Sequence, residues 1–121
     1  MIKLKRAYED PEPGDGTRYL VDRLWPRGVN KASLRIDHWL KDVAPSDGLR
    51  HWFNHDPLKW NEFRRRYFAE LDAKPDSWVE LVDAARKSAI TLVYGARDPE
   101  HNNAAALAEY LNAKAAPRKH R

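Results

Sequence analysis

The chain has 121 residues, of which 42% are hydrophobic and 33% charged, and these values indicate one soluble globular domain with a single core. It contains no cysteine, which excludes a disulfide framework, a thiolate zinc site and a cysteine nucleophile. The formal net charge is +4, and the last eight residues include Lys114, Arg118, Lys119 and Arg121. We therefore predict a nearly neutral domain over residues 1–113 and a basic, mobile tail over residues 114–121.

Two strands are predicted near the N-terminus. Apolar and basic side chains alternate over residues 2–8, which is typical of a strand. A loop of Pro, Gly and Asp over residues 10–16 separates it from a second strand over residues 19–25. Residues 29–42 are ambiguous. In one interpretation Asn30 or Ser33 caps a short helix whose apolar side holds Ile36, Trp39 and Leu40.

Helices are predicted in the middle of the chain. Ser46 is a good N-cap for a short helix, and Asp56 followed by Pro57 begins a longer one that extends to about residue 71. Ser77 and Glu80 form a capping-box pattern for a third helix, which ends near residue 88.

The last elements define the fold class. A continuous apolar run over residues 90–94 predicts a strand buried on both faces, and a final helix extends to about residue 114. The helical crossover between the second and third strands implies that these strands are parallel. We therefore predict a single α/β domain with Rossmann-like layering, in which helices pack on a small, mainly parallel sheet.

The first polar cluster follows the second strand, and ligands of such sheets bind beyond the carboxyl ends of the strands. Arg23 and Arg27 provide guanidinium groups suited to phosphate or carboxylate, and Asp22 could orient one of them. Trp25 could stack on a ligand ring, and Gly28 ends the segment. The alternative is an internal Asp–Arg ion pair, with Trp25 in the core.

A second cluster follows the strand over residues 90–94. It contains Tyr94, Arg97, Asp98, His101, Asn102 and Asn103. The start of the last helix lies here, and a helix N-terminus attracts anions. Asp98 could instead be a plain N-cap. The sequence has no Gly-rich phosphate loop, so a P-loop nucleotidase is not expected.

Two further features occur in the predicted helices. His51 and His55 have the spacing of metal ligands, but Pro57 interrupts the helix, and we predict no metal site. Arg64 falls within an apolar stripe, where it either pairs with a carboxylate at the edge or points into a polar cleft.

Residues that form a recognisable combination extend over nearly the whole chain. They are residues 21–28 (V-D-R-L-W-P-R-G), Trp39, Lys41, residues 44–46, Leu49, Arg50, Phe63, Tyr67, Glu70, Leu71, residues 91–94, Asp98 and Asn102 or Asn103. This combination resembles the short, YeaO-like branch of the DUF488 family. The resemblance implies one small α/β domain of bacterial or archaeal cytoplasmic type, in a family without an established function. Longer relatives carry a Cys-His-Arg triplet after the third strand, but their thiol chemistry does not transfer to a chain without cysteine.

We predict a cytoplasmic protein that binds an anionic small molecule, such as a nucleotide or phosphometabolite, with no cofactor and no membrane segment. The predicted ligand-binding residues are Arg23, Trp25, Arg27, Gly28, Ser46, Arg50, Tyr94, Arg97, Asn102 and Asn103. If the site is catalytic, the candidate residues are Asp22, His55, Asp98 and His101. Two alternatives are a nucleic-acid-binding module that uses the tail and Arg64 to Arg66, and a partner-binding protein without a small-molecule site.

Overall fold

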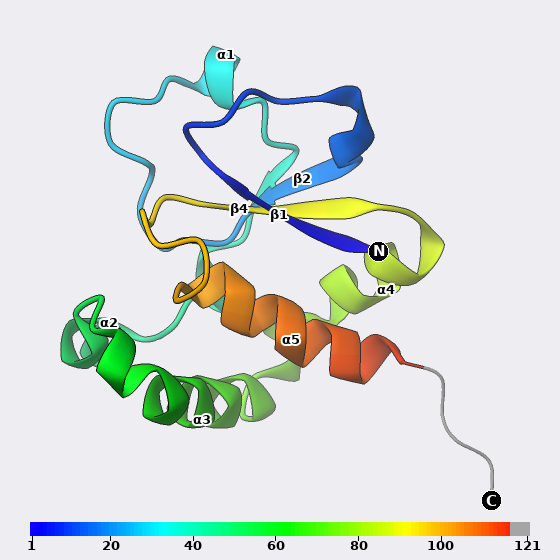
Figure 1. Ribbon diagram of the computed structural model, residues 1–121. Coiled ribbons are helices and arrows are strands. Elements are labelled where there is room, and N and C mark those ends of the chain that lie inside the picture. The colour runs from blue at the N-terminus through cyan, green and yellow to red at the C-terminus, as the bar shows by residue number, and fades with distance from the viewer. Residues whose placement is uncertain (117–121) are drawn as a thin grey trace, which may run out of the picture.

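The computed structural model describes residues 1–116, which form a parallel sheet with helices packed on it (Figure 1). The strands in this part of the chain are β1 (Ile2–Arg6), β2 (Thr17–Leu20), β3 (His38–Trp39) and β4 (Ile90–Tyr94). Their order in the sheet is β1-β4-β2-β3, and each neighbouring pair is parallel. The predicted α/β fold with a parallel sheet is therefore confirmed.

Helices lie on both faces of the sheet. They are α1 (Lys31–Leu34), α2 (Asp47–Phe53), α3 (Trp60–Asp72), α4 (Val79–Lys87) and α5 (Asn103–Ala115). Short 3₁₀ helices are η1 (Pro13–Asp15), η2 (Lys41–Val43), η3 (Pro57–Lys59) and η4 (Pro75–Ser77). The helices α2 to α5 cover one face, and α1 lies on the other (Figure 1). No helix in residues 1–116 is long and apolar enough to cross a membrane.

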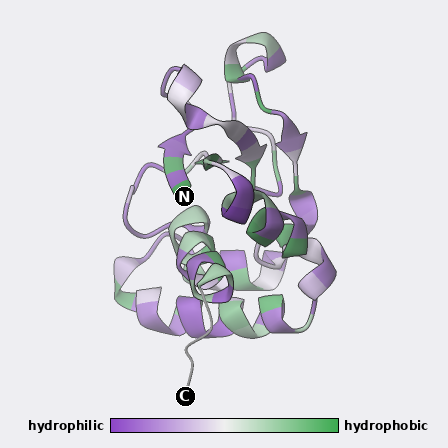
Figure 2. Cartoon of the chain, turned by 90° about the vertical axis from the view of Figure 1, so that its right-hand side faces the viewer, coloured by the Kyte–Doolittle hydropathy of each residue, from purple (hydrophilic) through white to green (hydrophobic). Residues whose placement is uncertain are grey.

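The alternation of side chains along β4 creates two cores. Leu92 and Tyr94 face the larger core beneath α3 and α5, whereas Val93 faces a smaller core that contains Leu20 and Leu34. Figure 2 shows both hydrophilic and hydrophobic residues along the packed helices, as expected when one helix face lies on the sheet. Burial on both faces explains why the apolar run of β4 is continuous.

Two predicted helix starts agree with the structure and one is wrong. The Ser46 hydroxyl accepts from the backbone N–H of Leu49, and Asp56 caps η3, which continues into α3. The predicted capping box at Ser77 does not form. Ser77 ends η4 and donates to the carbonyl of Lys74, because the turn begun by Pro75 continues past it. The helix α4 has no side-chain cap.

The sheet also corrects two predictions. The second strand ends at Leu20, not at residue 25, because the chain bends away from the sheet after Val21. Residues 38–39 form a strand that was not predicted, so Trp39 does not lie on the apolar side of a helix. Asn30, and not Ser33, caps the short α1. Of the predicted tail, residues 114–115 belong to α5, and residues 117–121 lie outside the described residues.

Candidate functional site

A pocket of about 380 Å³ opens where the carboxyl ends of β2 and β4 face α2. The carboxyl end of β4 and the helix α2 lie on the left of Figure 1. We call it the main pocket. Its walls include eight of the predicted site residues: Asp22, Arg23, Trp25, Arg27, Arg50, His55, Asn102 and Asn103. The two polar clusters therefore meet at one end of a parallel sheet, where ligands of such folds bind.

The main pocket contains three arginines and one carboxylate. Arg50 donates to Asp47 Oδ1 from Nη2 at 2.9 Å, and Arg23 Nε lies 3.6 Å from the same oxygen. The Nε atoms of Arg23 and Arg50 are buried, and neither has a hydrogen-bond partner within residues 1–116. The guanidinium of Arg27 forms no hydrogen bond or ion pair with the same described residues. A single exposed carboxylate, that of Asp47, is thus the ion-pair partner of two of the three arginines.

The carboxylate of the main pocket belongs to Asp22. Its Oδ2 accepts from the backbone N–H of Gly95 at 2.8 Å, and the Asn103 amide donates to the neighbouring carbonyl of Val21 at 3.1 Å. Burial raises the pKa of the Asp22 carboxyl, and the Gly95 hydrogen bond and the charge of Arg50 offset this only in part. A carboxyl with a raised pKa in a cleft is typical of functional sites.

A sharp turn after α2 forms another wall. Asn54 and His55 have φ angles of 48° and 55°, in the left-handed region that residues other than glycine rarely adopt. The turn ends the helix before it could continue to Pro57, and it places His55 in the pocket wall. Two consecutive residues in this conformation have a local energetic cost that the surrounding structure must offset.

Aromatic side chains enclose the other side. The Trp25 ring packs edge-on against Trp39, and the indole N–H of Trp39 donates to the carbonyl of Asp22 at 2.8 Å. Tyr8, at the end of β1, donates from its hydroxyl to the carbonyl of Arg27 at 3.0 Å. Trp25 is therefore both a partly buried packing residue and a pocket wall, so the two interpretations of this residue are compatible.

Six predicted site residues lie outside the main pocket: Gly28, Ser46, Tyr94, Arg97, Asp98 and His101. Ser46 donates to Glu70 at 2.6 Å while it caps α2. Asp98 accepts from the backbone of Glu100 and from His101, so it stabilises the turn before α5, whereas Asn102 is the N-cap of that helix. Tyr94 is buried in the core, and Arg97 lines a separate hollow.

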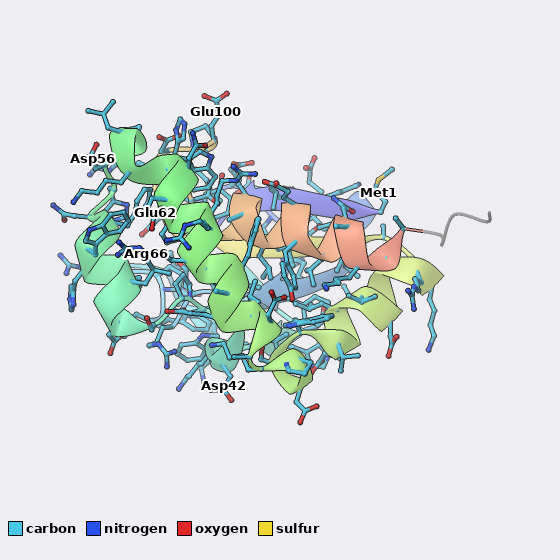
Figure 3. All side chains as sticks on the ribbon, turned by 90° about the horizontal axis from the view of Figure 1, so that it is seen from below. Met1, Asp42, Asp56, Glu62, Arg66 and Glu100 are labelled. Carbon is cyan, nitrogen blue, oxygen red and sulfur yellow. The ribbon has the colours of Figure 1, made fainter. Side chains whose placement is uncertain are left out.

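The arginines of α3 are paired with carboxylates. Arg64 donates from Nε to Glu109 at 2.9 Å, so it pairs at the edge of the apolar face. Arg65 and Arg66 both bond to Glu62, and Figure 3 shows Glu62 beside Arg66 on this helix. The charges of this surface are therefore largely neutralised by neighbours.

The sequence did not single out several other wall residues. Tyr8, Gly95, Phe53 and Phe63 line the main pocket, and Asp47 bridges two of its arginines. Tyr8 and Gly95 follow β1 and β4 closely, so the rule that located Asp22 also applies to them. No local pattern indicates the position of Asp47, because it depends on how α2 docks.

Comparisons with a family model and with known proteins indicate the same family. The sequence model described as "Inactive DUF488-N3 subclade" matches residues 1–121. The uncharacterized protein YeaO of Escherichia coli (strain K12) is 42% identical over 110 residues, which are 91% of this chain and 96% of that protein. The uncharacterized protein Rv3073c of Mycobacterium tuberculosis (strain ATCC 25618 / H37Rv) is 42% identical over 113 residues, or 93% and 95% of the two chains. No solved structure is significantly similar to the chain.

Proposed function

The chain belongs to the inactive DUF488-N3 subclade of the DUF488 family, as its YeaO-like residues predicted, and we propose that its main pocket binds an anionic small molecule. The observation that carries this proposal is the pair of buried Nε atoms of Arg23 and Arg50, neither of which has a hydrogen-bond partner in residues 1–116. A buried donor without a partner has a free-energy cost of about 1–3 kcal/mol, which an anion in the pocket would relieve. Arg27, at the same wall, adds a guanidinium without a carboxylate partner in residues 1–116.

The walls favour a ligand that also carries a ring, such as a nucleotide. Trp25 and Tyr8 offer aromatic surface beside the arginines, and stacking on such rings tolerates any base. The volume of about 380 Å³ is within the range of about 300–1,000 Å³ that is usual for small-molecule sites. Charge and shape together therefore suit a phosphorylated ring compound.

We further propose binding without turnover. The subclade is described as inactive, and the chain has no cysteine that could act as a nucleophile. Asp22 has a structural role at the strand ends, through its hydrogen bond with Gly95. A protein of this kind would sense or sequester its ligand.

Thermal unfolding with a panel of nucleotides and sugar phosphates tests the proposal. At least one ligand should raise the unfolding midpoint of the wild type, because it binds the folded state alone. The response should be lost in Arg27→Ala and retained in Lys87→Ala, which removes the same charge at the end of α4. If no ligand stabilises the wild type, or if Arg27→Ala responds equally, the proposal is wrong.

A second measurement tests binding without turnover. The phosphorus NMR spectrum of the bound ligand should stay unchanged during long incubation, and new signals would refute binding without turnover.

A further inference from the structure

A second hollow adjoins the main pocket, and we call it the outer hollow. Its walls are Arg6, Tyr8, Gly95 and Arg97. Tyr8 and Gly95 also line the main pocket, so the two spaces share a wall. A ligand could therefore extend from one into the other along the ring of Tyr8.

The outer hollow contains two arginines and no carboxylate. Arg6 is oriented by its Nε donor, which bonds to the carbonyl of Ala96 at 3.0 Å, and its guanidinium carbon lies 5.1 Å from the centroid of the Tyr8 ring. Its terminal nitrogens form no hydrogen bond or ion pair within residues 1–116. The side chain of Arg97 forms none with these described residues either.

The acidic residues that are close in sequence to these two arginines are already engaged. Glu9 accepts from the backbone N–H of Arg6 at 3.2 Å, and Asp98 accepts from the turn before α5 and from His101. Neither residue lines the outer hollow. Two guanidinium groups that face the same space without a carboxylate repel each other, and an anionic group between them would remove that repulsion.

We propose that the ligand carries two anionic groups and occupies both spaces, as a nucleoside bisphosphate would. This inference rests on the proposed function of the main pocket and specifies its ligand. One phosphate lies near Arg23, Arg27 and Arg50, and the second lies between Arg6 and Arg97. The Tyr8 ring flanks the part of the ligand that connects them. Each charge-assisted contact strengthens binding, so the second phosphate should increase affinity about tenfold or more.

Calorimetric titration with pairs of ligands tests this inference. The probes are the nucleoside 5′-monophosphate and the 3′,5′-bisphosphate of each common base, at one ionic strength. We expect the bisphosphate of at least one base to bind the wild type about tenfold tighter than its monophosphate. In Arg97→Ala this advantage should fall to about threefold or less, with the monophosphate affinity unchanged. In Lys87→Ala, the matched control, the advantage should remain.

The two proposals fail in different ways. If neither ligand of any pair binds but another ligand of the thermal panel does, this inference fails and the proposed function stands. If no ligand of either set binds, both fail. If a monophosphate binds but its bisphosphate is no tighter, or if Arg97→Ala weakens both equally, the outer hollow is not a phosphate site and the main pocket stands alone. Arg27→Ala should weaken both members of a pair, which separates the two spaces. Arg97 is exposed, so unfolding midpoints of the variants should confirm that the fold is intact.

Discussion

The carboxylate of Asp22 accepts a hydrogen bond of 2.8 Å from the backbone N–H of Gly95, and this bond joins the chain after β2 to the turn after β4. A Cβ atom at position 95 would lie 3.3 Å from the same carboxylate oxygen, so a side chain there would require the carboxylate to shift by a few tenths of an ångström. Together with the bond from the Asn103 amide to the Val21 carbonyl, this polar pair links two of the segments that form the pocket wall.

Replacing Asp22 with Asn should stabilise the protein at neutral pH by about 0.5–1 kcal/mol, because the neutral amide avoids the cost of burying a charged carboxylate. Burial raises the pKa of this carboxyl, so the folded chain binds its proton more tightly than the unfolded chain. The stability that the protonated Asp22 carboxyl contributes to the wild type is present at low pH, and it is lost as pH rises through the raised pKa. Urea unfolding should thus show the largest advantage of the variant at about pH 7 and a smaller one at about pH 4. A less stable variant at neutral pH would contradict this.

A buried ion cluster around Asp15, just before β2, should have the opposite effect: replacing its carboxylate should destabilise the protein. Asp15 accepts from Lys5 at 2.9 Å and from Arg18 at 2.6 Å, and all three side chains are largely buried. Asp15→Asn leaves two buried cations poorly compensated, so we expect a loss of about 3 kcal/mol in the free energy of unfolding. The exposed Asp10 has no side-chain partner in residues 1–116, and Asp10→Asn is the matched control.

The pH dependence of this loss follows from the pKa of Asp15. Burial raises that pKa, but the hydrogen bonds from Lys5, the Glu12 backbone and Arg18 together lower it by more than burial raises it, so the net shift is downward. The stability from Asp15 is therefore present above the usual carboxyl pKa and is lost as pH falls through the lowered value. Urea unfolding of Asp15→Asn and wild type should differ most at neutral pH and converge in acid. A constant difference would show that packing, and not charge, dominates.

The sequence predicted those elements whose signals are local. The apolar run of β4 and the cap at Ser46 specify their structures within a few residues. In contrast, β3 has two residues, and it exists because it pairs with Tyr19 and Leu20 of β2. Such pairing leaves no periodicity in the sequence, so it could not be predicted. At Ser77 two local signals compete, and the turn from Pro75 dominates over the capping pattern.

The location of the candidate site could be predicted from the sequence, but the pairing of its charged side chains could not. Ligands of parallel sheets bind beyond the carboxyl ends of the strands, and this rule depends on topology alone. It predicted the neighbourhood of Asp22, Arg27 and Asn103, which line one pocket. The partners of the arginines depend on helix docking, and the bond of Arg64 with Glu109 of α5 is an example. Whether a charged side chain is paired or free is decided by such tertiary contacts, and a sequence does not contain their distances.

Two glycines offer a sharp contrast in stability. Gly16 has a φ angle of 64°, and a Cβ atom there would lie 2.1 Å from the backbone oxygen of Ala89. We expect Gly16→Ala to reduce the free energy of unfolding by at least about 2 kcal/mol. Gly48 lies in α2 with no atom near its added Cβ, so Gly48→Ala should stabilise the protein by about 0.5 kcal/mol. Chemical denaturation of both variants measures the difference, and equal effects would contradict the conformation of the turn at Gly16.

Asp47 should oppose ligand binding, because its exposed carboxylate competes with an anion for Arg23 and Arg50. We expect Asp47→Asn to tighten anion binding about threefold at low ionic strength, with a smaller gain at high salt because exposed charges are screened. Asp83→Asn is the matched control, since it removes the same charge from the exposed side of α4. Titration of the best ligand from the thermal panel into both variants measures the effect. Equal affinities in the two variants would mean that Asp47 does not compete for the arginines, and weaker binding in Asp47→Asn would mean that it orients them.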